Sequence, residues 1–224
     1  MNCLENTRKF VFLGETGSGK TELSVNWAIH LAKNCGRRVR FFDMDQTKGL
    51  FRARDLKELL EAEGVEVLET IQFQDSPVVP QGVTGVLEDP ESICVFDVGG
   101  NAVGARMVGQ YARYLEDSWC LYVLNPNRPF SDEASELQDT MEWILKAGRV
   151  PHSQVHIISN PCLGDQTTAE TVVDGHRRLG KMLREMGKEP SVLTVEAALA
   201  QEVQKHVDCP VYPIRLYVKQ LYCT

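Results

Sequence analysis

The amino-acid sequence predicts a three-layer α/β fold, in which helices cover both faces of a doubly wound, mainly parallel sheet. Short apolar runs alternate with segments of helical period along the chain, which is typical of repeated strand–helix units. A glycine-rich turn joins the first apolar run to the first amphipathic segment. With 224 residues, 43% hydrophobic and 25% charged, we expect residues 1–224 to form a single soluble domain.

The individual elements follow from these two periodicities. The apolar runs predict strands at residues 8–13, 39–44, 65–70, 93–98, 120–124, 155–159 and 191–195. The segments between them predict helices at residues 20–34, 50–63, 103–116, 131–147, 167–187 and 196–206. In the first helix Leu23, Trp27 and Leu31 recur at every fourth position, so we expect this stripe to face the core.

Two segments depart from the alternation. Residues 72–92 contain Pro77, Pro80 and Pro90, which predicts a long surface loop that could serve as a docking surface. The C-terminal stretch PIRLYVKQLYCT (213–224) is short and alternates in polarity. It therefore predicts an edge strand rather than a membrane-binding helix.

Composition narrows the function classes. The net charge of -7 argues against sequence-independent binding of nucleic acid, which depends on basic side chains. No apolar run reaches membrane-spanning length and no secretory segment precedes the first strand. The seven cysteines are scattered without a CxxC pair, which favours a reducing compartment over a disulfide framework, although a few could ligate a metal. We therefore expect a cytoplasmic protein that binds neither membrane nor nucleic acid.

Residues 14–21, GETGSGKT, match the phosphate-binding pattern GxxxxGK[ST] between an expected strand and an expected helix. Backbone N–H groups of such a loop point at phosphates, while Lys20 would bridge their outer oxygens and the Thr21 hydroxyl would bind Mg²⁺. The pattern predicts a nucleoside triphosphate site within a P-loop NTPase fold. The expected cradle comprises Gly14, Glu15, Thr16, Gly17, Ser18, Gly19, Lys20, Thr21 and Glu22.

Acidic residues end two further strands, as a phosphate-transfer site requires. Asp43 and Asp45 stand two residues apart at the end of the second strand, so their side chains share a face. Asp97 ends the fourth strand and is followed by two glycines. Asp97 could bind Mg²⁺ through water and the N–H of Gly100 could sense the terminal phosphate, although an aspartate before glycines is also a common turn residue.

Together these residues resemble the deviant P-loop ATPases, which include the Min and Par partitioning proteins, the nitrogenase iron protein and the metal-centre insertion ATPases. Asp43-Met44-Asp45 resembles the Asp-x-Asp that ends the second strand in that family. Four further segments resemble a group of ParA-like ATP-binding proteins of anaerobic bacteria. They are FRARD (51–55), DVGGNAVGARMVGQY (97–111), NPNRPFS (125–131) and PVYPIRLYV (210–218).

The resemblance implies a role for each matching residue. Lys20 would bind phosphates, Thr21, Asp43 and Asp97 would support Mg²⁺, and Asp45 would orient or activate the attacking water. Asn160 would recognise adenine, with Pro161 beside it and backbone near Pro210 closing over the base. The guanine-reading pattern NKxD is absent, since proline replaces its lysine, so ATP is expected over GTP. Asn160 is also compatible with a turn cap, because Asn-Pro is a common turn signal.

One position departs from the family pattern. Glu15 stands where dimer-forming members carry a signature lysine that reaches the other subunit's nucleotide. A carboxylate cannot stabilise negative charge that develops on a phosphate, so either another cation substitutes or turnover is slow. Arg106 is the first candidate for such a catalytic cation. The others are Lys48, Arg52 and Arg54, and Arg128 at the edge of the cleft.

Three functions fit these residues. The first is an ATPase whose residues 43–55 and 97–111 order around MgATP and thereby control a nucleotide-linked homodimer or another protein partner. The second is an ATP-dependent small-molecule kinase or ligase, which would need an acceptor pocket for which the sequence offers no motif. The third is a regulator that binds ATP without hydrolysing it, which Glu15 favours.

Overall fold

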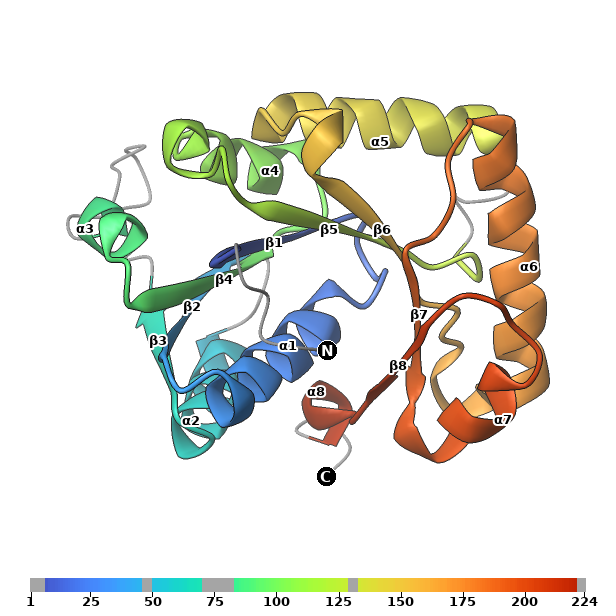
Figure 1. Cartoon of the computed structure of the whole chain (residues 1–224), viewed down its shortest axis with the longest axis horizontal. Helices are drawn as coiled ribbons and strands as arrows, with labels where there is room; N and C mark the ends of the chain where they lie inside the picture. The colour runs from blue at the N-terminus through green and yellow to red at the C-terminus, as the bar shows by residue number, and fades with distance from the viewer. Residues whose placement is uncertain (1–6, 46–49, 70–82, 129–132, 221–224) are drawn as a thin grey trace.

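The structure is a computed structural model that describes residues 7–45, 50–69, 83–128 and 133–220. Eight parallel strands form one sheet in the order β3-β2-β4-β1-β5-β6-β7-β8 (Figure 1). The strands are β1 (Lys9–Leu13), β2 (Arg38–Met44), β3 (Val65–Glu69), β4 (Ser92–Val98), β5 (Trp119–Leu124), β6 (Val155–Ser159), β7 (Val192–Glu196) and β8 (Val211–Ile214). The predicted three-layer α/β fold is confirmed.

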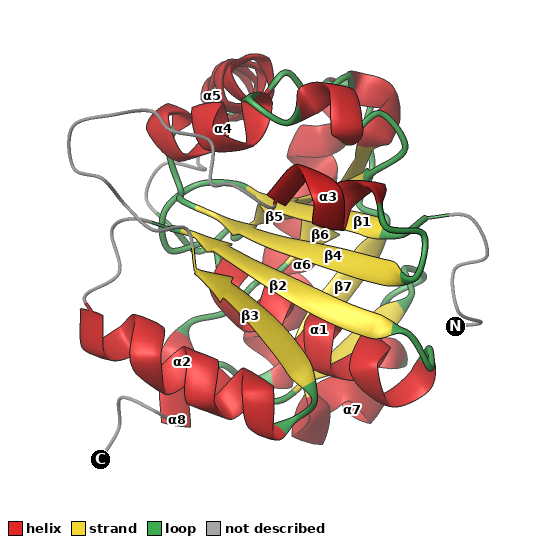
Figure 2. Cartoon of the chain, turned by 90° about the vertical axis from the view of Figure 1, so that its left-hand side faces the viewer, coloured by secondary structure: helices red, strands yellow, loops and turns green. Residues whose placement is uncertain are grey.

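Helices cover both faces of the sheet, and Figure 2 shows them above and below the strands. One face carries α1 (Lys20–Asn34), α2 (Leu50–Ala62) and α8 (Tyr217–Gln220). The other carries α3 (Val83–Glu88), α4 (Ala102–Gly109) and α5 (Ala134–Gly148). The helices α6 (Ala169–Glu185) and α7 (Ala200–Gln204) pack against β7 and β8.

The central strand β1 shows why strands of this sheet appear in the sequence as apolar runs. All five of its residues are buried. Phe10 and Phe12 contact the core on the α1 side, whereas Val11 and Leu13 contact the core below α4 and α5. A parallel strand between two helical layers must be apolar on both faces, because neither face meets water.

Three expected elements need correction. Residues 83–88 of the expected loop 72–92 form the helix α3, and Val83 and Leu87 bury their side chains; residues 70–82 lie outside the described residues. The expected helix 103–116 ends at Gly109, where α4 approaches α5 so closely that a Cβ would lie 2.8 Å from the Ala147 carbonyl oxygen. The expected edge strand begins earlier, at Val211, and is followed by α8.

The described cysteines are free thiols that serve packing. Burial raises the pKa of the Cys94 thiol to about 12 and raises the pKa of the Cys120 thiol as well, so neither is a ready metal ligand. Within the described ranges no group of three or more His, Cys, Asp or Glu side chains could hold a metal ion. Of the helices in those ranges, none combines the length and hydrophobicity needed to cross a membrane.

Candidate nucleotide-binding site

The P-loop leaves β1 after Leu13 and enters α1 at Lys20. Gly14, Gly17 and Gly19 have φ angles of 135°, 78° and 97°, in the region that favours glycine. A Cβ on Gly14 would lie 2.3 Å from the Val123 carbonyl oxygen, so the loop packs directly on β5. Backbone geometry and close packing therefore both require the glycines of the motif.

The first turn of α1 is open to a ligand. Its N-cap is Gly19, which offers no side-chain hydrogen bond to the first N–H groups of the helix. Such N–H groups, together with the helix dipole, attract anions. The Lys20 side chain is buried, and its Nζ donates to the Glu15 carbonyl oxygen at 2.6 Å across the loop. Lys20 therefore lies inside the loop, where phosphates would be held.

The Glu22 side chain has a different place from the one expected. Its carboxylate accepts hydrogen bonds from the backbone N–H of Tyr217 at 2.6 Å and of Val218. The same region of α1 holds Asn26, whose amide exchanges two 2.8 Å hydrogen bonds with the backbone of Arg215. Glu22 and Asn26 thus attach the segment after β8 to the P-loop helix, a contact that no sequence signal indicated.

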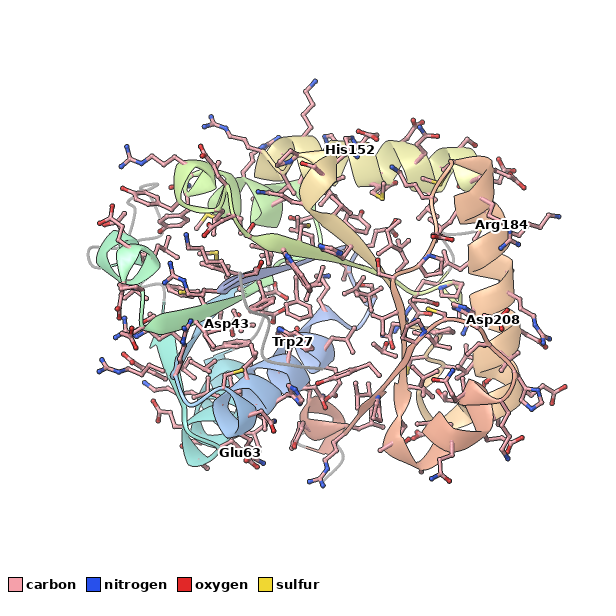
Figure 3. All side chains as sticks on the ribbon, viewed as in Figure 1. Trp27, Asp43, Glu63, His152, Arg184 and Asp208 are labelled. Carbon is pink, nitrogen blue, oxygen red and sulfur yellow. The ribbon has the colours of Figure 1, made fainter. Side chains whose placement is uncertain are left out.

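The three carboxylates lie at neighbouring strand ends. Asp43 and Asp97 are register partners on β2 and β4, and Asp97 also pairs with Phe12, two residues before the P-loop. Asp97 is fully buried. The N–H of Asp45 donates to Asp43 Oδ1 at 3.1 Å, and Asp45 Oδ1 lies 3.3 Å from the place of a Cβ on Gly99. Figure 3 labels Asp43 on β2 and Trp27 on α1.

Gly100 touches the P-loop itself. Thr16 Oγ1 donates to the Gly100 carbonyl oxygen at 3.2 Å, and a Cβ on Gly100 would lie 2.4 Å from the Thr16 backbone nitrogen. By contrast, Arg106 is exposed on α4, and no described hydrogen bond or ion pair joins it to the P-loop. Lys48 lies outside the described residues, as do the side chains of Arg52 and Arg54.

Asn160, which follows β6, braces the P-loop from the opposite side. Its Nδ2 donates to the Ser18 carbonyl oxygen at 2.8 Å, and its Oδ1 accepts from Thr194 Oγ1 at 2.9 Å. Pro161 packs on α6, where a Cβ on Gly175 would lie 2.8 Å from the Pro161 Cβ. Asn160 therefore lies next to the P-loop, and one of its side-chain hydrogen bonds holds the loop in place.

Pro210 does not join this group. It precedes β8, so it lies at the amino edge of a parallel sheet, whereas the P-loop, Asp97 and Asn160 follow their strands at the carboxyl edge. The expectation that Pro210 closes over the base is therefore wrong. The residues after β8 that reach the P-loop edge are Arg215 to Val218.

Two side chains complete the loop's surroundings. Arg128, on the connection after β5, donates from Nε to the Gly17 carbonyl oxygen at 3.1 Å. Glu15 turns inward: its Oε1 is buried without a hydrogen-bond partner, as is the Tyr122 hydroxyl oxygen. Burial raises the pKa of Glu15, and the Lys20 charge opposes this rise. The position directly after β5 was the available signal for Arg128, since β5 borders β1.

The residues present fit a magnesium-bound nucleotide. The hydroxyl of Thr21 and the carboxylates of Asp43 and Asp97 are hard oxygen donors, which Mg²⁺ prefers together with phosphate oxygens and water. The lack of a side chain at Gly14, Gly17 and Gly19 lets the loop pack against Val123, Arg128 and Asn160. When bound, the metal would neutralise phosphate charge, and the residues that would support it are Thr21, Asp43 and Asp97.

No protein-family model matches the chain, and no curated protein sequence matches it. The structure is similar to a nucleotide-binding protein from Archaeoglobus fulgidus in complex with ADP, with a TM-score of 0.52 and 17% identity over 96% of this chain and 85% of that one. It is also similar to a Borrelia burgdorferi B31 protein assigned to plasmid partition and bound to AMPPNP, with a TM-score of 0.53 and 12% identity over 97% and 95%. The chain thus has the α/β fold of P-loop nucleotide-binding proteins.

Proposed function

We propose that this protein is a cytoplasmic, magnesium-dependent ATPase of the deviant P-loop class that acts as a nucleotide-controlled switch for a protein partner. The carrying observation is the contact between Thr16 in the P-loop and Gly100 after β4. A triphosphate held by the loop would lie beside Gly99 and Gly100, so occupancy of the loop and the position of α4 are coupled. Loss of a terminal phosphate is a common trigger for such segments.

Each residue of the site would have its own role. Lys20 would exchange its bond to the Glu15 carbonyl for bonds to phosphate oxygens. Asp43 and Asp97 would support the metal with Thr21, and Asp45 would orient the attacking water. This division is supported by the register of Asp43 with Asp97 and by the hydrogen bond from the Asp45 N–H to the Asp43 carboxylate. Nucleotide-linked homodimerisation and adenine recognition by Asn160 belong to the same proposal.

A binding and turnover assay tests the proposal. The wild-type protein should bind ATP in preference to GTP by calorimetry and release phosphate. Asp45→Asn should keep ATP affinity within about threefold while it lowers turnover by at least about 100-fold, a typical loss for a positioned acid or base. Size-exclusion chromatography with and without a non-hydrolysable ATP analogue tests whether the nucleotide changes the oligomeric state. Absence of ATP binding would refute the proposal.

A regulator that binds ATP without turnover is the second candidate, and Glu15 favours it. Its Oε1 atom is buried, and the side chain supplies no positive charge that could stabilise a phosphate. This candidate predicts stoichiometric ATP binding, with phosphate release no higher in the wild type than in Asp45→Asn. Equal rates in the two proteins would therefore decide for the regulator, and a large difference would decide for the ATPase.

A further inference from the structure

The connection between β5 and α5 places a guanidinium on the apex of the P-loop. Arg128 Nε donates to the Gly17 carbonyl oxygen at 3.1 Å. A Cβ built on Gly17 would lie 3.2 Å from both Cζ and Nε of Arg128. The guanidinium therefore lies against the Gly17 backbone, and glycine at this position leaves the room for that approach.

The backbone that carries Arg128 is firmly held. The Arg128 N–H donates to the Asn125 carbonyl oxygen at 3.2 Å, and Asn125 Nδ2 donates to the Cys162 carbonyl oxygen at 2.9 Å. On the other side, Arg178 of α6 donates to the Pro126 carbonyl oxygen at 2.5 Å and to Asn127 Oδ1 at 2.8 Å. These bonds tie residues 125–128 to the β6 and α6 region, so the arginine is presented by a braced turn.

The charges around the P-loop suggest a role for Arg128 in phosphate binding. Glu15 turns its carboxylate inward, and the described contacts place two basic side chains on the P-loop, Lys20 and Arg128. A guanidinium has five N–H donors in a planar fork that suits phosphate oxygens, and the bond to Gly17 uses one. Gly17 belongs to the loop whose N–H groups would hold the phosphates, so a phosphate there would lie within reach of the long arginine side chain.

We propose that Arg128 is a phosphate-contacting residue that grips the outer phosphates of the nucleotide and supplies, within one chain, a positive charge that Glu15 does not provide. This inference rests on the proposed function, because it needs a nucleotide in the P-loop. The arginine then acts on the ligand directly. The competing explanation is a purely structural clamp, in which Arg128 only holds the Gly17 carbonyl.

Titrations with ATP, ADP and AMP separate these explanations. A residue that touches the outer phosphates matters most for ATP and least for AMP, whereas a clamp on the loop affects every nucleotide that binds there. We expect Arg128→Gln to weaken ATP binding at least tenfold and AMP binding less than threefold. Arg128→Lys, which keeps the charge without the fork, should lose less ATP affinity than Arg128→Gln.

A matched control is Arg177→Gln on α6, which removes an exposed arginine that pairs with Asp174 at 3.8 Å. It should bind all three nucleotides as the wild type does. Equal losses for ATP and AMP in Arg128→Gln, or no loss at all, overturn the proposal. If Arg128→Gln does not fold by circular dichroism, the same ATP and AMP comparison in Arg128→Lys decides. A wild-type protein that binds no ATP refutes the proposed function as well, whereas normal wild-type binding with a silent Arg128→Gln refutes only the role of the arginine.

Discussion

Asn160→Ala is the sharpest test of how the P-loop is held. The Asn160 side chain is 4% exposed and spans two parts of the chain. It donates to the Ser18 carbonyl oxygen at 2.8 Å and accepts from the Thr194 hydroxyl at 2.9 Å. Alanine removes both bonds and leaves the Thr194 hydroxyl with only its 3.3 Å bond to the Ser159 carbonyl oxygen.

The magnitude follows from these two bonds. A typical buried hydrogen bond contributes about 1 kcal/mol net, and each partner left unsatisfied costs about 1–3 kcal/mol. We therefore expect Asn160→Ala to lower the free energy of unfolding by about 2–4 kcal/mol. Thr194→Val removes only the bond to the Asn160 oxygen and the weaker one to Ser159, at 3.3 Å, so it should cost about 1–2 kcal/mol.

Urea denaturation followed by tryptophan fluorescence measures both losses, since Trp27 is largely buried on α1. The double variant shows whether the two side chains act as a pair, because residues in one network are not additive. A loss below about 0.5 kcal/mol for Asn160→Ala, which is usual for surface substitutions, would contradict the bracing role.

Three further substitutions, one of them with a matched control, probe the loop and the core. Gly19→Ala would place a Cβ 2.2 Å from Asn160 Nδ2, at a residue whose φ is 97°, so calorimetry should find that ATP binding is lost. The control is Gly36→Ala, whose Cβ would meet nothing within 4 Å. It should lower the free energy of unfolding by only about 1–2 kcal/mol, through backbone strain. Burial raises the pKa of Glu15 above 4.5, so ionisation of this carboxyl at higher pH disfavours the folded state. Glu15→Gln removes that ionisation. Thermal melting should therefore show the variant to be more stable than the wild type at pH 7, and the difference should shrink toward pH 4. Phe41→Ala should cost about 3–5 kcal/mol in urea denaturation, because Phe41 is fully buried.

The central strands were predictable because they are buried on both faces, and every residue of β1 and β4 is buried. Such strands must be apolar throughout, and their runs appear in the sequence as blocks between polar stretches. The helix α3 was missed for the opposite reason. Its six residues, VTGVLE, have no capping signal and follow a stretch rich in proline, so its stability comes from Val83 and Leu87 packing into the core. Tertiary contacts of this kind override local propensity.

The residues of the candidate site also differ in how far the sequence predicts them. The P-loop glycines and the strand-end aspartates could be assigned because motif spacing fixes their place relative to strands. The inward turn of Glu15 and the contact of Arg128 with Gly17 depend on how separate loops meet, which no local pattern encodes. Pro210 was placed by the family resemblance alone. Because it precedes β8, which begins at Val211, it lies at the opposite edge of the sheet from the P-loop.

Under the proposed function, the source of a second positive charge beside Lys20 decides whether phosphate release needs two subunits. Glu15 brings a carboxylate instead of a cation to the loop: the residue is half-buried, its Oε1 atom is buried, and its charge lies near Lys20 and Tyr122. If Arg128 contacts the phosphates from within the chain, a partner subunit is not needed to complete the charge around them. Phosphate release per molecule should then stay constant as the protein is diluted past its dissociation point, and should fall in Arg128→Gln at every concentration. A rate per molecule that drops on dilution would show that a residue from a second copy completes the site.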